Sequence, residues 1–206
     1  PILSDDARRA NFTNEGGVDG RTRFLHNVMG LWLLSESLRH WEPAATDAQR
    51  SSLLGELLAE AAKVSSDVPI FDVNDPAFLP SGDIPERIRS WYLAHGERAP
   101  ETRAEVVRCI IESLAEAFAS AVQEASRLAD HDVSVIHLVG GGSQNTLLCQ
   151  ATANRSGLRV VAGPTEATAM GNMLIQARAL GQLAPDLQAV REVVARSSHV
   201  IEYLPR

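Results

Sequence analysis

Three consecutive glycines, Gly140-Gly141-Gly142, followed by Ser143-Gln144-Asn145, form the stretch of this sequence best suited to chemistry. Hydropathy predicts a strand over Val133 to Val139 just before them and a helix that begins near Asn145. Glycines let the backbone turn sharply and let a ligand approach without a Cβ in the way. The helix start adds unpaired N–H groups and the positive end of the helix dipole. The arrangement suits a phosphate or a flat polar base.

The glycine run matches neither of two common phosphate-binding motifs. No Gly-Lys-Ser/Thr follows it, as a Walker A loop requires, and its spacing differs from the dinucleotide-binding G-x-G-x-x-G. On spacing alone, a tight turn without a ligand therefore stays open as a second interpretation. A similar stretch, Gly163-Pro164-Thr165-Glu166-Ala167, precedes another predicted helix. There the favoured interpretation is a helix capped by Thr165 or Glu166, with no ligand.

One polar residue, Asn27, shares an apolar stripe with Phe24 and Leu31 in a segment, Thr22 to His40, that has helical spacing. This spacing predicts one helix with Gly30 inside it, where glycine costs about 1 kcal/mol relative to alanine. A buried amide on such a face needs hydrogen-bond partners. A ligand or a neighbouring backbone would serve equally well, and both interpretations stay open.

The composition limits the class of protein. The chain has 206 residues, of which 45% are hydrophobic and 22% charged, and a formal net charge of −7. These are globular proportions, and an acidic chain without a basic stripe argues against a nucleic-acid binder. Its apolar stretches are too short for a membrane span, and no signal peptide is visible. Cys109 and Cys149 stand alone in predicted helices, so we expect reduced core thiols and a cytoplasmic protein. Neither the cysteines nor the six histidines have metal-ligand spacing, so no metal site is expected among them.

The order of the remaining elements is typical of an α/β domain that ends in a β-α-β-α unit. Capping boxes at Thr46 and Thr102 predict helices that run to about Lys63 and Asp130. The other predicted elements are a strand and turn over Asn11 to Gly17, an irregular functional surface loop over Val68 to His95 with a short helix from Ile84 to Leu93, a strand over Leu158 to Ala162, and helices over Glu166 to Leu180 and Pro185 to Arg196.

Five stretches of the sequence form a further pattern. In chain order they are N-F-T-N-E-G-G (Asn11 to Gly17), F-L-H-N-V-M-G-L-W-L-L (Phe24 to Leu34), F-D-V-N-D-P-A-F (Phe71 to Phe78), V-G-G-G-S-Q-N-T-L-L (Val139 to Leu148) and A-G-P-T-E-A-T-A-M-G-N (Ala162 to Asn172). Together they resemble the FGGY family of carbohydrate kinases, and the T-N-E-G-G and N-V-M-G-L-W-L-L runs point to its rhamnulokinase branch. The resemblance implies an α/β fold, the ribonuclease H-like (actin-like ATPase) lobe. Residues 1–206 would then be the C-terminal, nucleotide-binding half of a two-lobe sugar kinase, without its first strands.

The resemblance also implies a phosphotransferase that uses ATP and Mg²⁺ to phosphorylate the O1 hydroxyl of L-rhamnulose, or a related ketose, in rhamnose catabolism. Asn27 is the implied sugar contact. The family has a Gln at the position of Ser35, so the shorter serine here would reach ATP only through water. Gly141 is the ATP contact that the resemblance implies in the glycine turn, and we expect its neighbours Gly140, Gly142, Gln144 and Asn145 to bind ATP with it.

In the family, the catalytic Asp base and a phosphate-binding hairpin precede the position of Pro1. We therefore expect no catalytic residue in this chain, no kinase activity from it alone, and the N-terminal lobe of the same kinase as its partner. Two alternatives stay open. An actin-like ATPase lobe should lack Asn27 and its flanking pattern, and a non-enzymatic sugar-binding module would bind sugar without ATP.

Overall fold

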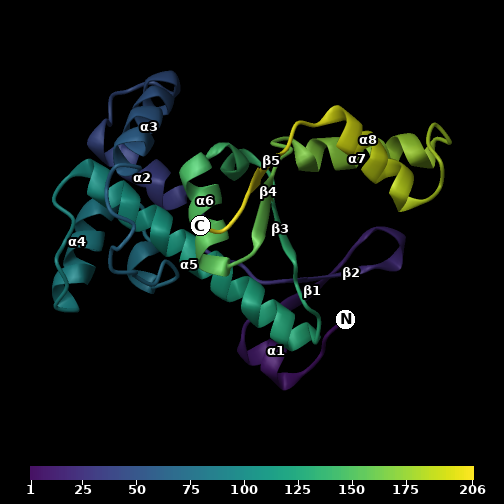
Figure 1. The fold of residues 1–206 in the computed structure, drawn as a ribbon, viewed down its shortest axis with the longest axis horizontal. Coiled ribbons are helices and arrows are strands. Elements are labelled where there is room, and N and C mark those ends of the chain that lie inside the picture. The colour runs from purple at the N-terminus through teal and green to yellow at the C-terminus, as the bar shows by residue number, and fades with distance from the viewer. The chain divides into compact units, whose positions relative to one another are not determined.

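The computed structural model describes all 206 residues, which divide into two compact units, Pro1–Val133 and Ser134–Arg206 (Figure 1). The first unit is mostly helical and contains one β-hairpin. Its elements are α1 (Asp5–Arg9), β1 (Thr13–Gly16), the 3₁₀ turn η1 (Val18–Gly20), β2 (Thr22–Leu25), α2 (Trp32–Trp41), α3 (Asp47–Ala61), the 3₁₀ turn η2 (Pro76–Phe78), α4 (Ile84–Ala94) and α5 (Arg103–Ala129).

The 27-residue helix α5 is the longest helix of the first unit and lies at its centre (Figure 1). Its residues 106–115 are all buried, and Val107, Ile110 and Leu114 are fully inaccessible. The segment over Val68 to His95, expected to be a surface loop, contributes to this core. The Phe71 and Phe78 rings are buried 5.0 Å apart, and the Phe71 amide donates to Ser113 Oγ at 3.2 Å. The aromatic side chains there contribute to packing, because burial of their apolar surface away from water stabilises the fold.

The single helix predicted over Thr22 to His40 is wrong for its first ten residues. Thr22–Leu25 is strand β2, which pairs antiparallel with β1 in the register Thr13↔Leu25 and Gly16↔Thr22. The Phe12 and Phe24 rings stack with centroids 4.7 Å apart across the hairpin. The apolar spacing that suggested a helix is also satisfied by a strand, a coil and a helix in series, and pairing with β1 decides between them. Gly30 therefore precedes α2, and its carbonyl accepts from Leu33 N at 3.4 Å.

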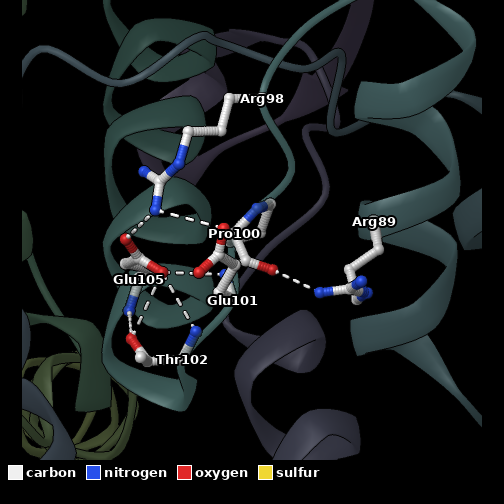
Figure 2. Close-up of polar contacts among 6 residues, drawn as sticks. All are labelled: Arg89, Arg98, Pro100, Glu101, Thr102 and Glu105. Carbon is white, nitrogen blue, oxygen red and sulfur yellow. Dashed lines mark hydrogen bonds and ion pairs between the residues drawn. The ribbon is translucent and has the colours of Figure 1, made fainter.

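The capping boxes predicted at Thr46 and Thr102 are both confirmed. Thr102 Oγ1 accepts from the Glu105 amide at 3.1 Å, and the Glu105 carboxylate accepts from the amides of Thr102 and Glu101 at 3.0 and 2.8 Å (Figure 2). Arg98 donates to the same carboxylate at 3.0 Å. These bonds, chiefly those from the two backbone amides, lower the pKa of Glu105 to about 2.

The lowered pKa predicts a pH-dependent loss of stability that Glu105→Gln should remove. Glu105 is charged in both states above its ordinary value of 4.5, so its stabilisation is complete there and is lost as the pH falls toward about 2. At pH 6 we expect Glu105→Gln to lower the free energy of unfolding by about 1 kcal/mol, and this difference should vanish near pH 2. Urea denaturation followed by tryptophan fluorescence measures it, because all three tryptophans lie in the first unit.

Glu101→Gln is the control for this prediction, since the Glu101 side chain is 68% exposed and its ion pair with Arg98 is 3.6 Å long. We expect its effect to stay within about 0.5 kcal/mol at every pH. A Glu105→Gln deficit of the same size at pH 6 and pH 2 would contradict the assignment of the lowered pKa to this carboxylate.

The second unit is a three-stranded sheet with helices. Its elements are β3 (Val135–Leu138), the 3₁₀ turn η3 (Gly141–Gln144), α6 (Thr146–Ser156), β4 (Arg159–Ala162), α7 (Ala167–Ala179), α8 (Leu187–Ser197) and β5 (Ile201–Tyr203). Strand β3 runs parallel to β4, with Leu138 opposite Ala162, and α6 connects them. This confirms the predicted β-α-β-α order. Strand β5, which was not expected, pairs antiparallel with the other edge of β4.

The core of the second unit lies between α6 and the sheet. Cys149 and Ala153 of α6 pack with Val160 and Ala162 of β4, and Tyr203 of β5 covers the cluster. Cys149, like Cys109 of α5, is a free, buried thiol, as expected from the sequence. Burial raises the pKa of Cys149 to about 11, so the thiol stays protonated and packs as a small apolar group. None of the helices in either unit combines the length and the apolar composition needed to cross a membrane.

Candidate functional site

The glycine turn between β3 and α6 has the backbone geometry that its sequence suggested. Gly140 has φ +79°, a conformation that side-chain-bearing residues rarely adopt, and it turns the chain out of β3. Its carbonyl then accepts from Ser143 N at 3.0 Å and from Ser143 Oγ at 2.7 Å. Asn145 is buried and caps α6, because its Oδ1 accepts from Leu148 N at 3.0 Å. The serine and asparagine side chains therefore hold the turn against the helix.

The outer side of the turn is bare backbone beside open space. A Cβ added to Gly140 or Gly141 would meet no heavy atom within 4 Å. Gly141 and Gly142 are the first two residues of η3, so their N–H groups have no acceptor within that turn. Gln144 is exposed next to them. Chemically, the turn offers unpaired N–H donors and no steric barrier, which suits a phosphate or a nucleotide.

A second loop, which follows β4, is hydrogen-bonded to the glycine turn. Gly163 N donates to Leu138 O at 2.9 Å, and Gly140 N donates to Pro164 O at 3.2 Å. The helix after this loop, α7, has Glu166 at its N-cap position but no side-chain cap bond, so the predicted side-chain cap by Thr165 or Glu166 is wrong. Gly163 instead allows the backbone at His199 to lie close to this loop. Gly163 has φ +112°, and a Cβ there would lie 2.9 Å from the carbonyl oxygen of His199.

The two remaining predicted site residues lie in the first unit. Asn27 was expected on a buried helical face, but it is exposed in the coil between β2 and α2. Its neighbours His26 and Val28 line a cleft of about 460 Å³ together with Phe12, although Asn27 itself does not line it. The Asn27 amide is therefore exposed to solvent between the end of β2 and the start of α2.

Ser35 is an exposed residue in the first turns of α2. Its hydroxyl donates to Leu31 O of its own helix at 3.3 Å. The side chain thus lies along the helix surface and extends no further. The structure therefore groups the predicted site residues as one continuous turn in the second unit, and as Asn27 and Ser35 on successive segments of the first.

The comparison with protein families decides the identity of the domain. Residues 1–180 match the model of the FGGY family of carbohydrate kinases, C-terminal domain. This chain belongs to the FGGY family of carbohydrate kinases. The family resemblance seen in the sequence is thereby confirmed.

Several curated relatives of this FGGY chain are rhamnulokinases. The chain is 36% identical to the rhamnulokinase of Bacteroides thetaiotaomicron, covering 100% of this chain and 41% of that protein. It is 39% identical to that of Halalkalibacterium halodurans, covering 99% and 42%, and 40% identical to that of Klebsiella pneumoniae, covering 100% and 40%. The chain thus spans about two fifths of the length of these relatives.

Among solved structures, the chain is similar to the xylulose kinase from Rhodospirillum rubrum. The TM-score is 0.62 at 21% sequence identity, and the match covers 95% of this chain and 38% of that protein. At this identity the likeness concerns the fold, and it confirms the predicted α/β, actin-like ATPase architecture.

The sequence singled out the Gly163-Pro164 stretch of this FGGY domain, but not its role in holding the glycine turn. Gly163, Pro164 and His199 contact the turn or its neighbours through backbone atoms, so their side-chain types gave little indication. One signal was available, since a glycine within two residues of the end of each of two parallel strands suggests two adjacent loops at one sheet edge.

Proposed function

We propose that this FGGY chain supplies the ATP-binding half of a kinase that phosphorylates L-rhamnulose at O1. The glycine turn of Gly140 to Gln144 carries the proposal, because it combines unpaired N–H groups with open space at Gly141. The rhamnulokinase names of the relatives, at 36–40% identity, support L-rhamnulose as the sugar. Two free, buried thiols suit the cytoplasm as the compartment.

In this proposal the glycine turn contacts ATP mainly through its backbone. The amides of Gly141 and Gly142 donate to phosphate or ribose oxygens, and exposed Gln144 adds a side-chain contact. Asn145 supports the glycine turn, because its cap fixes the first turn of α6 against η3. Such a site contributes by holding the nucleotide in place, which is the main requirement of phosphoryl transfer.

The proposal includes Mg²⁺, which shields the phosphate charge when it is bound. Neither unit contains a group of three or more His, Cys, Asp or Glu side chains placed to hold a metal ion. These residues therefore do not fit a metal cage, and we propose that Mg²⁺ arrives on the ATP phosphates. No step assigned to this chain depends on a metal ligand of its own.

We assign Asn27 to the sugar, because an amide donates and accepts hydrogen bonds and this one is exposed without a structural task. Ser35 is the weaker part of the assignment. Its hydroxyl is directed to Leu31 O, so it would contact ATP through a bridging water. We propose that the general base is an Asp in the part of the relatives that this chain does not span. Residues 1–206 alone would therefore not phosphorylate the sugar.

The test is a titration of the chain with Mg·ATP and, separately, with L-rhamnulose, xylulose and L-fuculose. We expect saturable binding of Mg·ATP and preferential binding of L-rhamnulose. Binding of nucleotide without any sugar would favour the actin-like ATPase alternative, and binding of sugar without nucleotide would favour the sugar-binding module. Turnover of L-rhamnulose and Mg·ATP by the chain alone would refute the assignment of the base to another lobe.

Asn27→Ala is expected to weaken L-rhamnulose binding about tenfold, which corresponds to the loss of about one net hydrogen bond. The dissociation constant for Mg·ATP should stay within about twofold, since Asn27 contacts sugar alone in this proposal. Gln123→Ala, which removes another exposed amide of the first unit, serves as the control. Equal sugar affinity of wild type and Asn27→Ala would remove Asn27 from the site.

A further inference from the structure

The carboxyl-terminal strand of the chain lies against the loop that holds the glycine turn. Strand β5 pairs with β4 through Ile201↔Ala162 and Tyr203↔Val160. The match to the FGGY family model ends at residue 180, before β5 begins. Strand β5 therefore lies outside the matched residues, and it completes the sheet that carries the turn.

Close backbone contacts join the entry of β5 to Gly163. An ideal Cβ on Gly163 would lie 2.9 Å from His199 O and 3.5 Å from Val200 Cγ1. A real Cβ does not come this close to a backbone oxygen, so the two chain segments approach only because residue 163 is glycine. Gly163 is buried at this contact.

From Gly163 the chain of contacts continues to the turn. Gly163 N donates to Leu138 O, the last residue of β3, and Pro164 O accepts from Gly140 N at 3.2 Å. The turn residue Gly140 is therefore fixed by the loop after β4, and that loop is fixed from its other side by His199 and Val200.

The end of β5 is also fastened to the helix that the turn begins. Gln150 of α6 donates through Nε2 to Leu204 O at 2.8 Å, and Asn154 Oδ1 accepts from Arg206 N at 3.0 Å. Tyr203 covers the core cluster around Cys149. The residues before β5 thus approach the loop beside the glycine turn, and the residues after β5 are hydrogen-bonded to α6.

We propose that β5 and its entry residues His199 and Val200 are positioning elements for the glycine turn, acting through Gly163 and Pro164. The inference rests on the proposed nucleotide binding by that turn. None of these residues touches the nucleotide. They set the direction of the Gly140 amide and of the bare backbone after it, so their loss lowers nucleotide affinity without removing a nucleotide contact.

The experiment compares Gly163→Ala with Gly171→Ala in the 206-residue chain. Gly171, on α7, has open space around it and no positive φ, so the same added methyl group should be tolerated there. We expect Gly163→Ala to raise the dissociation constant for Mg·ATP about tenfold and to speed hydrogen exchange at the Gly140 amide, and Gly171→Ala to change both by less than about twofold. The change in exchange should be confined to the turn and its neighbouring loop, whereas a merely structural defect would speed exchange throughout the sheet.

Val200→Ala is the second variant, because it shortens the side chain whose Cγ1 lies 3.5 Å from where a Gly163 Cβ would be, and it introduces no clash. Val200 is 44% exposed, so the chain should still fold if Gly163→Ala does not. We expect a twofold to threefold, or about 0.5 kcal/mol, weaker affinity for Mg·ATP. Unchanged exchange at Gly140 in the folded variants overturns the positioning role, whatever the nucleotide result. Failure of the proposed function is distinct, since the wild-type chain would then not bind Mg·ATP at all.

Discussion

Gly141→Ala is expected to raise the dissociation constant for Mg·ATP at least about tenfold while leaving the chain equally stable or more stable. An alanine Cβ at position 141 would meet no protein atom within 4 Å, and the residue does not have a positive φ. Alanine at such a site stabilises by up to about 1 kcal/mol, because it restricts the unfolded chain. The same methyl group would occupy the open space where we propose that the nucleotide lies.

Affinity for Mg·ATP is expected to fall while stability stays equal or rises, so a general folding defect would not produce the expected result. Nucleotide affinity is measured by titration with Mg·ATP, and stability by urea denaturation of the same samples. Gly140→Ala is the informative neighbour, since it also faces open space but has φ +79°. We expect it to lose about 1–2 kcal/mol of stability from backbone strain in addition to affinity. If Gly141→Ala binds Mg·ATP as tightly as the wild type, the turn is not the nucleotide site.

Glu112→Ala is expected to destabilise the first unit by about 3–5 kcal/mol. Arg108 and Glu112 form an ion pair of 2.8 Å inside α5, with side chains that are only 10% and 4% exposed. Arg108 Nε is already buried without a hydrogen-bond partner. Removing the carboxylate would leave the guanidinium charge buried without this partner, and a buried charge that loses its partner is costly.

The double variant Arg108→Met/Glu112→Leu separates this cause from a simple loss of volume. Replacing both charges by apolar groups of similar size removes the buried charge, so we expect stability within about 1 kcal/mol of the wild type. Arg8→Ala, which breaks an ion pair whose side chains are 79% and 74% exposed, should cost less than about 0.5 kcal/mol. A double variant as unstable as Glu112→Ala would show that the pair stabilises the fold by more than mutual neutralisation.

Local features of the sequence predicted the helical parts of this protein well. The capping boxes at Thr46 and Thr102 place the starts of α3 and α5 to within one residue, because a cap is made by side chains within one turn of the chain. The β3–turn–α6–β4 segment was also predictable, since the glycines of the turn and the flanking apolar runs leave few alternatives. The stretch around the glycine turn was also one of the five that led to the FGGY family, which the family comparison confirms.

The errors lie where distant segments decide the outcome. Apolar spacing from Thr22 onward predicted a helix, but pairing with β1 makes Thr22–Leu25 a strand and leaves Asn27 exposed in coil. The segment around Phe71 was expected at the surface, but the face of α5 buries it. Neither result is encoded within one helical turn of the residues concerned, so periodicity alone could not find it.

The sequence by itself determined the family, the glycine turn and the two capping boxes, because each motif depends on residue types within a few positions of one another. Tertiary structure alone decided which backbone atoms hold that turn. Strand β5 is only three residues long, and it forms because β4 offers an unpaired edge. Gly163 is required there because His199 O approaches within 2.9 Å of where a Cβ would be. Such contacts join residues 36 positions apart (199 − 163) through backbone atoms, which every residue possesses and no motif records.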